Sequence, residues 1–262
     1  MGLQGILRWP RCRQVITKCL KPSPLIFGGE GWVRGYRPFD FRPFDKSSDY
    51  GTISVNPFIV LGTNPTVKTE FEALVENAKA CTICAAYLPL GPRPVFQIHP
   101  ASRILIVSQA PGRKVHETGI PFNDASGNRL RDWMGVDRDT FYNPEKIAIL
   151  PMGFCYPGTG SSGDLPPRPE CAPAWQDLFL AQMPRVELKL IIGTYALKWH
   201  VGKRQGANLT ETVKNWAEYW PSVLPLPHPS PRNNIWLAKN AWYEATVVPV
   251  LKKRVSAILN KT

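Results

Sequence analysis

An apolar strand that leads directly into a turn of small residues is the feature that most constrains this chain. Residues 104–107 read Ile-Leu-Ile-Val, and residues 110–112 read Ala-Pro-Gly. The apolar run predicts a buried parallel strand, and open α/β sheets bind ligands where the carboxyl ends of such strands open into loops. Shortly afterwards, Pro121 fixes the backbone next to Phe122, so we expect an aromatic ring near the exposed amides of that turn.

A second strand-like stretch, residues 222–226, leads into a loop that contains a histidine and three prolines. This loop, residues 227–233, reads Pro-His-Pro-Ser-Pro-Arg-Asn. Because parallel strands end at the same edge of a sheet, we expect His228 to meet Phe122 there and to form a site. Each residue also has a simpler explanation, since the histidine could bond only to nearby backbone and the phenylalanine could belong to the core.

Strand patterns alternate with helix patterns from residue 70 onward. The strands are predicted near residues 103–108, 146–151, 187–193 and 222–226, and the helices near residues 70–80, 126–134, 172–182, 194–201, 209–219 and 242–259. This alternation predicts an α/β fold of three layers, α/β/α, around a central, mainly parallel four-stranded sheet. We expect residues 153–169, which are rich in glycine and proline, to form neither element and to lie around Cys155 and Cys171.

The first part of the chain has a different composition from the rest. In residues 1–70, arginines and lysines are set among glycines, prolines and aromatic residues with little periodicity. We expect this stretch to be a mostly disordered basic extension before an α/β/α domain at residues 71–262. It could be a nucleic-acid-binding arm, an organelle-type presequence, or an extension created by a start codon placed too early.

Composition limits the class of protein and the kind of partner. The chain has 262 residues, is 44% hydrophobic and contains no apolar stretch of eighteen residues, so we expect one enzyme-sized domain, no membrane span and a monomer. Its formal net charge of +12 favours a polyanionic partner such as DNA, because basic side chains near phosphates release condensed counterions. A basic surface that binds nothing is the alternative.

Several ordered motifs carry a resemblance to a known family. They are residues 108–112 (Ser-Gln-Ala-Pro-Gly), 118–122 (Thr-Gly-Ile-Pro-Phe), 126–127 (Ser-Gly) and 228–231 (His-Pro-Ser-Pro). In this order they resemble the uracil-DNA glycosylase superfamily, particularly its iron-sulfur families four and five, and the likeness spans residues 75–259. The resemblance implies a DNA repair enzyme that hydrolyses the N-glycosidic bond of a flipped-out uracil, or a related deaminated base, and leaves an abasic site.

The resemblance also implies catalytic roles for two residues. In the resembling families the histidine of the His-Pro-Ser motif contacts the base carbonyl, which assigns His228 to stabilising the departing base. Ala110 stands where the best-known members carry an aspartate, whereas Asp124 lies three residues before Gly127, as the proposed catalytic aspartate of family five does. We therefore expect Asp124 to orient the attacking water, although it could equally cap a helix. No lysine occupies the motif positions, so we expect a monofunctional enzyme.

Further residues are assigned to binding the base and the DNA. For the base they are Gln109, Ala110, Gly112, Phe122 as the stacking face, and Asn123, and for the DNA they are Ser230, Arg232 and Asn233. Pro151 replaces the asparagine that reads the uracil edge in family four. Asn123 or the backbone around Met152 and Gly153 would then read the base, or the pocket would take another base. Gly112 stands where an aromatic residue blocks the thymine methyl group, and Arg232 could enter the gap left by the flipped base or bind a phosphate.

Four cysteines have the spacing of a metal site. Cys81 and Cys84 form a C-x2-C pair, and fifteen residues separate Cys155 from Cys171. The spacing leaves open an iron-sulfur cluster, zinc, or unligated thiols, while disulfides are disfavoured because no secretory signal is evident. The resemblance implies that these four cysteines bind a [4Fe-4S] cluster, with zinc as the lesser possibility. Cys12 and Cys19 are expected to be free thiols.

Two other classes of protein stay open. Ala110 and Pro151 would fit a protein of the same fold that recognises damaged bases or nucleic acid without cutting. The other is a metabolite-binding α/β protein, for which the positive net charge and the spacing of the four cysteines would have to be coincidences. For the location we expect a bacterial cytoplasm, with mitochondrion or nucleus possible if the source is eukaryotic.

Overall fold

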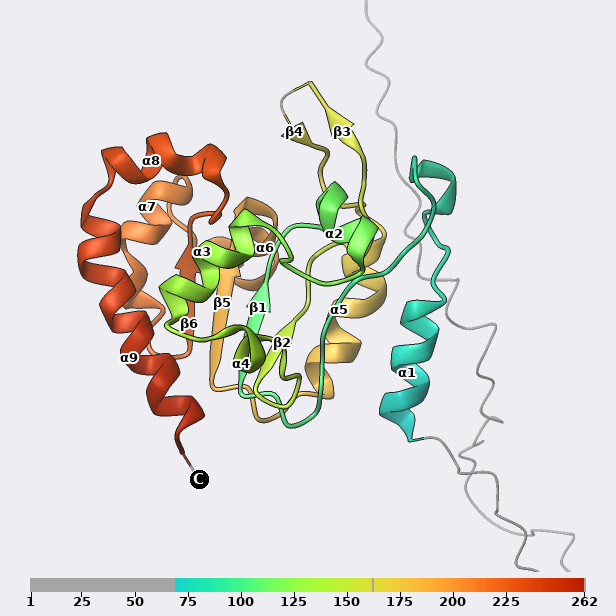
Figure 1. Cartoon of the computed structure of the whole chain (residues 1–262), viewed down its shortest axis with the longest axis horizontal. Coiled ribbons are helices and arrows are strands. Elements are labelled where there is room, and N and C mark those ends of the chain that lie inside the picture. Colours follow the sequence, from blue (N-terminus) through green and yellow to red (C-terminus); the bar gives the residue numbers. More distant parts are fainter. Residues whose placement is uncertain (1–68, 162, 262) are drawn as a thin grey trace, which may run out of the picture. The chain divides into compact units, whose positions relative to one another are not determined.

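Four short apolar segments lie side by side as the central sheet (Figure 1). The structure is a computed structural model that describes residues 69–161 and 163–261. All four strands are parallel, in the order β2-β1-β5-β6, and they are β1 (Ile104–Val107), β2 (Ile147–Ile149), β5 (Leu188–Ile192) and β6 (Val223–Leu226). The predicted fold class and all four predicted strands are confirmed, each strand being shorter than predicted.

Alternate residues of the strands face two separate cores. On β1, Ile104 and Ile106 pack into one core, whereas Leu105 and Val107 pack into the other. All four residues are fully buried, because β1 has a strand on each side and helices above and below. Burial of this kind stabilises a fold by about 25 cal/mol for each Å² of apolar surface removed from water. A continuous apolar run in the sequence is therefore the pattern expected of a strand that is covered on both faces.

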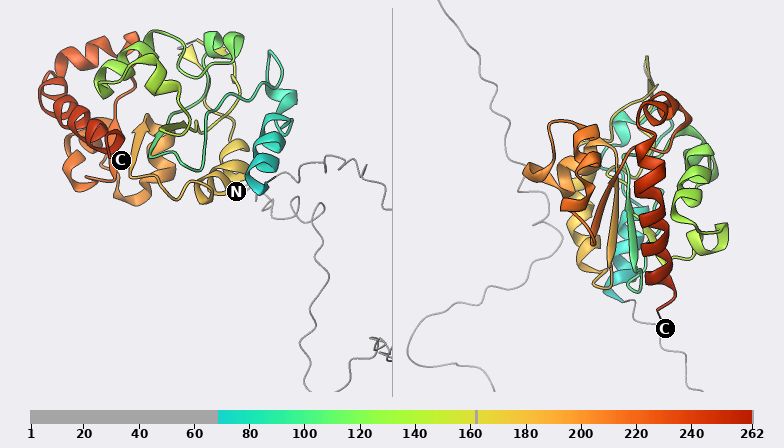
Figure 2. Two further views of the ribbon diagram at one scale, coloured as in Figure 1. Left: turned by 60° about the horizontal axis from the view of Figure 1, so that its bottom comes forward. Right: turned by 90° about the vertical axis from the view of Figure 1, so that its left-hand side faces the viewer.

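Helices form the two outer layers (Figure 2). They are α1 (Glu70–Lys79), α2 (Arg113–Thr118), α3 (Ala125–Met134), α4 (Arg138–Tyr142), α5 (Cys171–Ala181), α6 (Thr194–His200), α7 (Leu209–Lys214), α8 (Asn234–Lys239) and α9 (Val248–Leu259). Residues of α3, α4 and α9 fill the core on one face of the sheet, and residues of α1, α5 and α6 fill the core on the other. Short single turns are η2 (Ala85–Tyr87), η3 (Gly202–Arg204), η4 (Trp216–Glu218), η5 (Pro231–Asn233) and the π-helical η6 (Tyr243–Val247).

The structure differs from the predicted elements in several places. Residues 153–169 contain a small antiparallel hairpin, β3 (Thr159–Gly160) with β4 (Gly163–Asp164), so the expectation of no strand there was wrong. Strands of two residues carry no alternation that a sequence pattern could reveal. The helix predicted at 209–219 ends at Lys214 and is followed by η4, and the helix predicted at 242–259 begins with the π turn η6. The short helices α2, α4 and α8 were not predicted.

The start of the described part is a capped helix. Thr69 Oγ1 accepts a hydrogen bond from the Glu72 amide at 3.2 Å, and the Thr69 amide donates to the Glu72 carboxylate at 2.9 Å. This reciprocal capping box fixes the beginning of α1. The predictions for residues 1–70, and for Cys12 and Cys19 as free thiols, fall almost wholly on residues outside the described part. Among the described residues, no helix has the length and apolarity that crossing a membrane requires.

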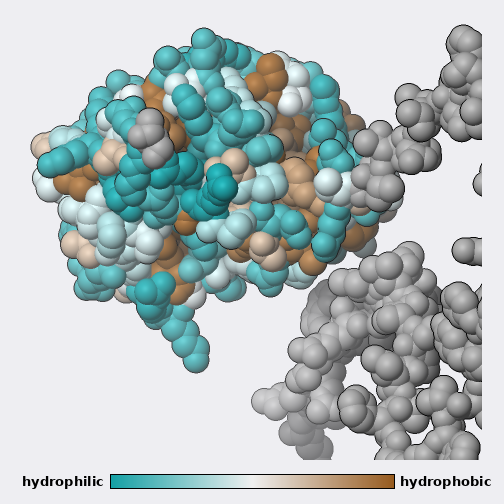
Figure 3. Space-filling view, turned by 90° about the horizontal axis from the view of Figure 1, so that it is seen from below, coloured by the Kyte–Doolittle hydropathy of each residue, from teal (hydrophilic) through white to brown (hydrophobic). Residues whose placement is uncertain are grey.

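The amino-terminal edge of the sheet is closed by charged side chains. Glu187, just before β5, pairs with Arg103 and with Lys261, whose Nζ lies 2.7 Å from the Glu187 carboxylate. These two cations hold the pKa of Glu187 below its usual range, the hydrogen bond from Lys261 being the largest cause. Seen from this side, the surface is mainly hydrophilic, with hydrophobic residues in separate groups (Figure 3). The cavity that could bind a ligand lies at the opposite, carboxyl edge.

At the carboxyl edge, the beginning of α3 depends on a glycine. A side chain at Gly127 would place its Cβ far inside van der Waals contact with the carbonyl oxygen of Phe122. Among the described residues, Phe122 is the only non-glycine residue with a positive φ, at 53°. Such a conformation is unfavourable for a bulky residue and persists only where its surroundings impose it. The close approach of the Phe122 backbone to Gly127 provides that constraint.

Gly127→Ala should therefore destabilise the protein by about 3 kcal/mol or more, because backbone rather than a flexible side chain must move. Gly112→Ala is the matched control, since its Cβ would meet only the Asp164 carboxylate at 3.3 Å. We expect the control to change the free energy of unfolding by less than about 1 kcal/mol. Urea unfolding followed by circular dichroism measures both, and equal stability of the two variants would contradict the role given to Gly127.

Candidate active site

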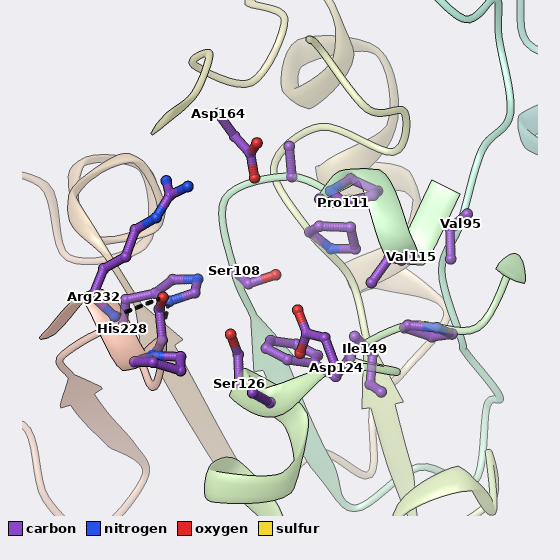
Figure 4. Close-up of a pocket in the computed structure, with 18 residues that line it drawn as sticks. Val95, Ser108, Pro111, Val115, Asp124, Ser126, Ile149, Asp164, His228 and Arg232 are labelled. Carbon is purple, nitrogen blue, oxygen red and sulfur yellow. Dashed lines mark hydrogen bonds between the residues drawn. The ribbon is translucent and has the colours of Figure 1, made fainter. Parts of the chain in front are cut away.

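Loops that follow three strands enclose a cavity of about 280 Å³ at the carboxyl edge of the sheet (Figure 4). Its walls include Ser108 and residues 110–112 after β1, residues 121, 122 and 124–126 before and at the start of α3, Pro151 after β2, and His228 after β6. Phe122 and His228 thus line one cavity although they lie far apart in the sequence. The volume lies near the lower end of the range for ligand sites, about 300–1,000 Å³, so the cavity suits a small, flat molecule.

His228 presents a neutral imidazole to this cavity. Its Nδ1 accepts a hydrogen bond from the Ser230 amide at 3.2 Å, so the ring proton of the neutral form is on Nε2. Burial lowers the pKa of His228 from its ordinary value, and the negative charges of Asp124 and Asp164 oppose this in part. The ring faces the cavity (Figure 4), where its Nε2–H can act as a hydrogen-bond donor at neutral pH.

The loop that carries His228 is held from two sides. Asn233 Nδ2 donates to the His228 carbonyl oxygen at 2.8 Å. From α3, Arg129 Nη1 donates to the carbonyl oxygens of Pro229 and Ser230 at 3.4 and 3.3 Å, and its Nη2 donates to Asn234 Oδ1 at 2.8 Å. Arg129 therefore joins α3 to the His228 loop. Sequence reasoning missed it, because only the packing of α3 brings residue 129 to this loop.

Asp124 serves as the N-cap of α3 and also lines the cavity. Its Oδ1 accepts a hydrogen bond from the Gly127 amide at 2.9 Å. The cap holds one carboxylate oxygen, and the group lies across the cavity from His228 (Figure 4). The two uses foreseen for Asp124 are thus compatible, since capping sets the orientation of a carboxylate that reaches the cavity.

Phe122 belongs both to the core and to the cavity wall. Its side chain is 9% exposed, and its ring meets that of Phe141 edge to face with centroids 6.3 Å apart. The contact with Phe141 fixes the ring in a position where it still lines the cavity. Phe122 is therefore a core residue that also lines the cavity, and its role as a binding face stays a prediction.

The other predicted residues are divided between the cavity, its mouth and the outside. Ala110 and Gly112 line the cavity, and Ser230 and Arg232 line both it and an adjoining outer hollow that Gln109 and Asn233 also border. Asn123 does not line the cavity, because its Oδ1 accepts a hydrogen bond from Arg138 Nη2 at 3.3 Å. The amides of Met152 and Gly153 donate to the carbonyl oxygens of Ser108 and Gln109, both at 2.8 Å. Neither amide is therefore available to a ligand.

The β3–β4 hairpin adds a carboxylate that sequence reasoning missed. Asp164 lies at the rim of the cavity, between Arg232 and Pro111 in the view of Figure 4. The hairpin approaches the His228 loop so closely that a side chain at Gly163 would collide with the Arg232 guanidinium. Ile235 lies three residues after Arg232 in the sequence. At 71% exposed, it is the most exposed large apolar residue in the described part of the chain. No pattern in residues 153–169 indicated that this segment reaches the site.

A comparison with known protein families identifies the superfamily to which this chain belongs. A model of the uracil DNA glycosylase superfamily matches residues 96–252 of this chain, more than half of its length. The chain belongs to the uracil DNA glycosylase superfamily. The matched range includes all four strands of the sheet and both loops that enclose the cavity, so the resemblance read from the motifs is confirmed at the level of the superfamily.

The four predicted cysteine ligands line one small cavity of their own. Cys81, Cys84, Cys155 and Cys171 meet there beside Phe154, whose amide donates to Cys171 Sγ at 3.3 Å. Burial, together with a smaller effect of the neighbouring thiols, raises the pKa of Cys155 to about 11 and that of Cys171 to about 12. Across the described residues, no group of three or more His, Cys, Asp or Glu side chains is arranged to hold a metal ion.

The state of His228 can be tested by its titration. We expect a pKa below the ordinary value of about 6.5 and a proton on Nε2 in the neutral form. Asp124→Asn should lower the pKa further, because the variant removes a negative charge that favours the imidazolium ion. Nitrogen-15 NMR of the histidine rings measures both the pKa and the tautomer. A pKa above 6.5, or a proton on Nδ1, would contradict this description of the site.

Proposed function

We propose that the protein is a DNA glycosylase that hydrolyses the N-glycosidic bond of a flipped-out uracil, or a related deaminated base, and leaves an abasic site. Membership of the superfamily supports a glycosylase-like hydrolase. The observation that carries the proposal is the pairing of a neutral imidazole N–H of His228 with the Asp124 carboxylate across one base-sized cavity. An enzyme of this type must bind the base outside the duplex, and the cavity offers room for it.

His228 stabilises the base as it departs. Breaking the N-glycosidic bond leaves negative charge on the base and positive charge on the sugar. A hydrogen bond from His228 Nε2 to a carbonyl oxygen of the base becomes stronger as that charge develops. The Ser230 amide fixes the tautomer, and Asn233 and Arg129 fix the loop, so the donor is already in place before the bond breaks.

Asp124 orients the attacking water and stabilises the positive sugar. Its hydrogen bond to the Gly127 amide holds the carboxylate toward the cavity, whereas Ala110 has no group that could accept a proton. Among the described residues, none that lines the cavity is a lysine, so a Schiff base with the sugar has no nucleophile there. This set of side chains supports attack by water and hence a monofunctional glycosylase.

Phe122 and Asp164 contact the base itself. Stacking on an aromatic ring contributes about 1–3 kcal/mol, which offsets much of the few kcal/mol that extruding a nucleotide costs. Asn123 is turned to Arg138, and the Met152 and Gly153 amides are already bonded, so we assign the edge of the base to Asp164, a carboxylate at the rim of the cavity. An ionised carboxylate only accepts hydrogen bonds, so it selects a base with an N–H group at that edge, as uracil has.

The rim of the cavity binds the DNA around the flipped nucleotide. Ser230, Arg232 and Asn233 follow His228, and the net charge of +12 favours a polyanion. Arg232 lies against Gly163 and is placed to contact a phosphate. We assign the gap left in the base stack to Ile235, whose apolar side chain is exposed, and not to the charged Arg232.

The four cysteines are proposed to hold a [4Fe-4S] cluster. Three of the four thiols are buried, and burial and the neighbouring thiols raise the pKa values of Cys84, Cys155 and Cys171, so these three need a positive metal centre to stay ionised. A cluster binds each thiolate through a different iron, so the thiols need not converge on one point as they must around a single ion. The Phe154 amide supplies a hydrogen bond to a ligand sulfur. The cluster would join the segment after α1, the segment after β2 and the start of α5, which is a structural role.

Asp124→Asn should lower the turnover of a uracil-containing oligonucleotide by about 10²–10⁴-fold, because the amide cannot act as a base. Asparagine caps helices as well as aspartate does, so the fold should persist. The matched control is Asp132→Asn on the exposed side of α3, where the carboxylate lies 3.7 Å from Lys252 Nζ. Strand scission by alkali after incubation measures abasic sites, and the control should cleave like the wild type.

Unchanged turnover in the Asp124 variant would remove this residue from the mechanism. A wild-type protein that shifts uracil-containing DNA in a gel but yields no alkali-sensitive sites would instead support the non-catalytic damaged-base-binding protein. Ala110 and Pro151 at the cavity are the observations that favour this second candidate. A panel of oligonucleotides with uracil, hypoxanthine or xanthine identifies the base that is removed.

Protein purified without oxygen should be brown, with broad absorbance near about 400 nm from iron-thiolate charge transfer. Cys84→Ser should abolish the colour, because Cys84 lines the four-thiol cavity. Cys12→Ser and Cys19→Ser are the controls, since these residues lie outside the predicted ligand set, and both should keep the colour. Iron and acid-labile sulfide are then measured for each protein. A colourless protein with zinc would establish the alternative metal, and a metal-free protein would refute both.

A further inference from the structure

A second hollow, of about 540 Å³, lies on the other side of the β3–β4 hairpin from the catalytic cavity. We call it the Tyr87 groove, lined by Tyr87, Leu90, Arg113, Tyr156, Gly158 and Leu165. Two segments of the chain contribute residues to both hollows. The helix α2 contributes Val115 to the cavity and Arg113 to the groove, and the hairpin region contributes Asp164 to the cavity and Leu165 to the groove. The groove thus lies next to the candidate active site, and neighbouring residues of α2 and of the hairpin region line the two hollows.

Large apolar side chains are exposed in this groove. Tyr87 is 62% exposed, and Leu90 and Leu165 are each 46% exposed. All three line the same hollow, although they come from segments on opposite sides of it. Contiguous apolar surface on an otherwise polar protein usually marks a place where another molecule binds.

The Tyr87 ring is held in place from one side. The guanidinium of Arg168 lies 4.2 Å from the ring centroid, over the face of the ring. Two hydrogen bonds from Arg168 to the Glu170 carboxylate, at 3.2 and 2.7 Å, hold this guanidinium in turn. A ring covered on one face and exposed elsewhere is a prearranged surface for stacking, because its free rotation is already restricted.

The walls of the groove are rigid as well. Gly158, with φ +108°, lies against Pro89, where a Cβ would come within 3.2 Å of the Pro89 ring. The Tyr156 hydroxyl bonds to Thr159 Oγ1, and the Leu165 amide donates to the Gly158 carbonyl oxygen at 2.8 Å. These contacts hold the base of the hairpin against the segment that carries Tyr87, so the groove exists before anything binds in it.

We propose that the Tyr87 groove binds a second, unstacked nucleobase of the DNA strand whose flipped base occupies the catalytic cavity. An aromatic face beside basic side chains is what single-stranded nucleic acid recognises, since every base can stack and every phosphate attracts a cation. Arg113 also lines the groove, where its Nε lies 3.2 Å from the Glu117 carboxylate. The Arg113 side chain is 69% exposed, and an ion pair in water is weak, so the guanidinium can still turn to a phosphate. This inference rests on the proposed function. It implies a preference for single-stranded over duplex substrate, because a duplex must first give up the stacking of that second base.

Tyr87→Ala tests the groove, with Tyr87→Phe as the matched control that keeps the ring. Fluorescence anisotropy measures the binding of a uracil-free oligonucleotide, as a single strand and as a duplex. The alanine variant should bind the single strand about 5- to 100-fold more weakly, the loss expected for one stacked base. The phenylalanine variant should bind within about two-fold of the wild type, and the duplex should be affected less than the single strand.

On uracil-containing single strands the alanine variant should show a raised KM and an unchanged kcat, since Tyr87 does not line the catalytic cavity. Equal single-strand binding by the wild type and Tyr87→Ala overturns the inference, and a protein partner for the groove would give this result. An equal loss with Tyr87→Phe also overturns it, because stacking needs only the ring. If no variant cleaves DNA but the binding difference appears, the groove stands and the proposed enzyme activity fails.

Discussion

The contact between the Phe122 carbonyl and Gly127 is the constraint on which the site depends. Because residue 127 has no side chain, the backbone at Phe122 can turn into the left-handed region and approach the first turn of α3. That turn makes Asp124 the N-cap, and it places the Phe122 ring between Phe141 and the cavity. The stacking face and the carboxylate thus share one local backbone conformation.

Arg129 extends this arrangement to the opposite wall. Its guanidinium bonds to the backbone of the His228 loop, so the helix that begins at Asp124 also positions the imidazole. A shift of about 1 Å between reacting groups can cost about a hundredfold in rate, and a direct connection between the two walls limits such shifts. The sheet also positions the site, because its four parallel strands end at one edge and bring the loops that follow them together.

The sequence predicted the parts of this protein that follow from local pattern. The apolar run at residues 104–107 indicated a buried strand, and parallel topology then brought His228 and Phe122 to the same edge. Asp164 and Tyr87 were beyond reach, because a hairpin of two-residue strands and a single turn of 3₁₀-helix leave no periodicity. Asn123 lies beside Phe122 in the chain, yet it turns to Arg138, since sequence proximity does not fix side-chain direction.

The β3–β4 hairpin is a common wall, and this has a thermodynamic consequence. Asp164 lines one hollow and Leu165 the other, and the hydrogen bond at the base of the hairpin holds these two neighbours at a fixed spacing. A strand that binds in one hollow is therefore kept at a high effective concentration beside the other. Release of a free base from the cavity would leave the strand bound through the remaining hollow alone, and the strand would then dissociate more readily.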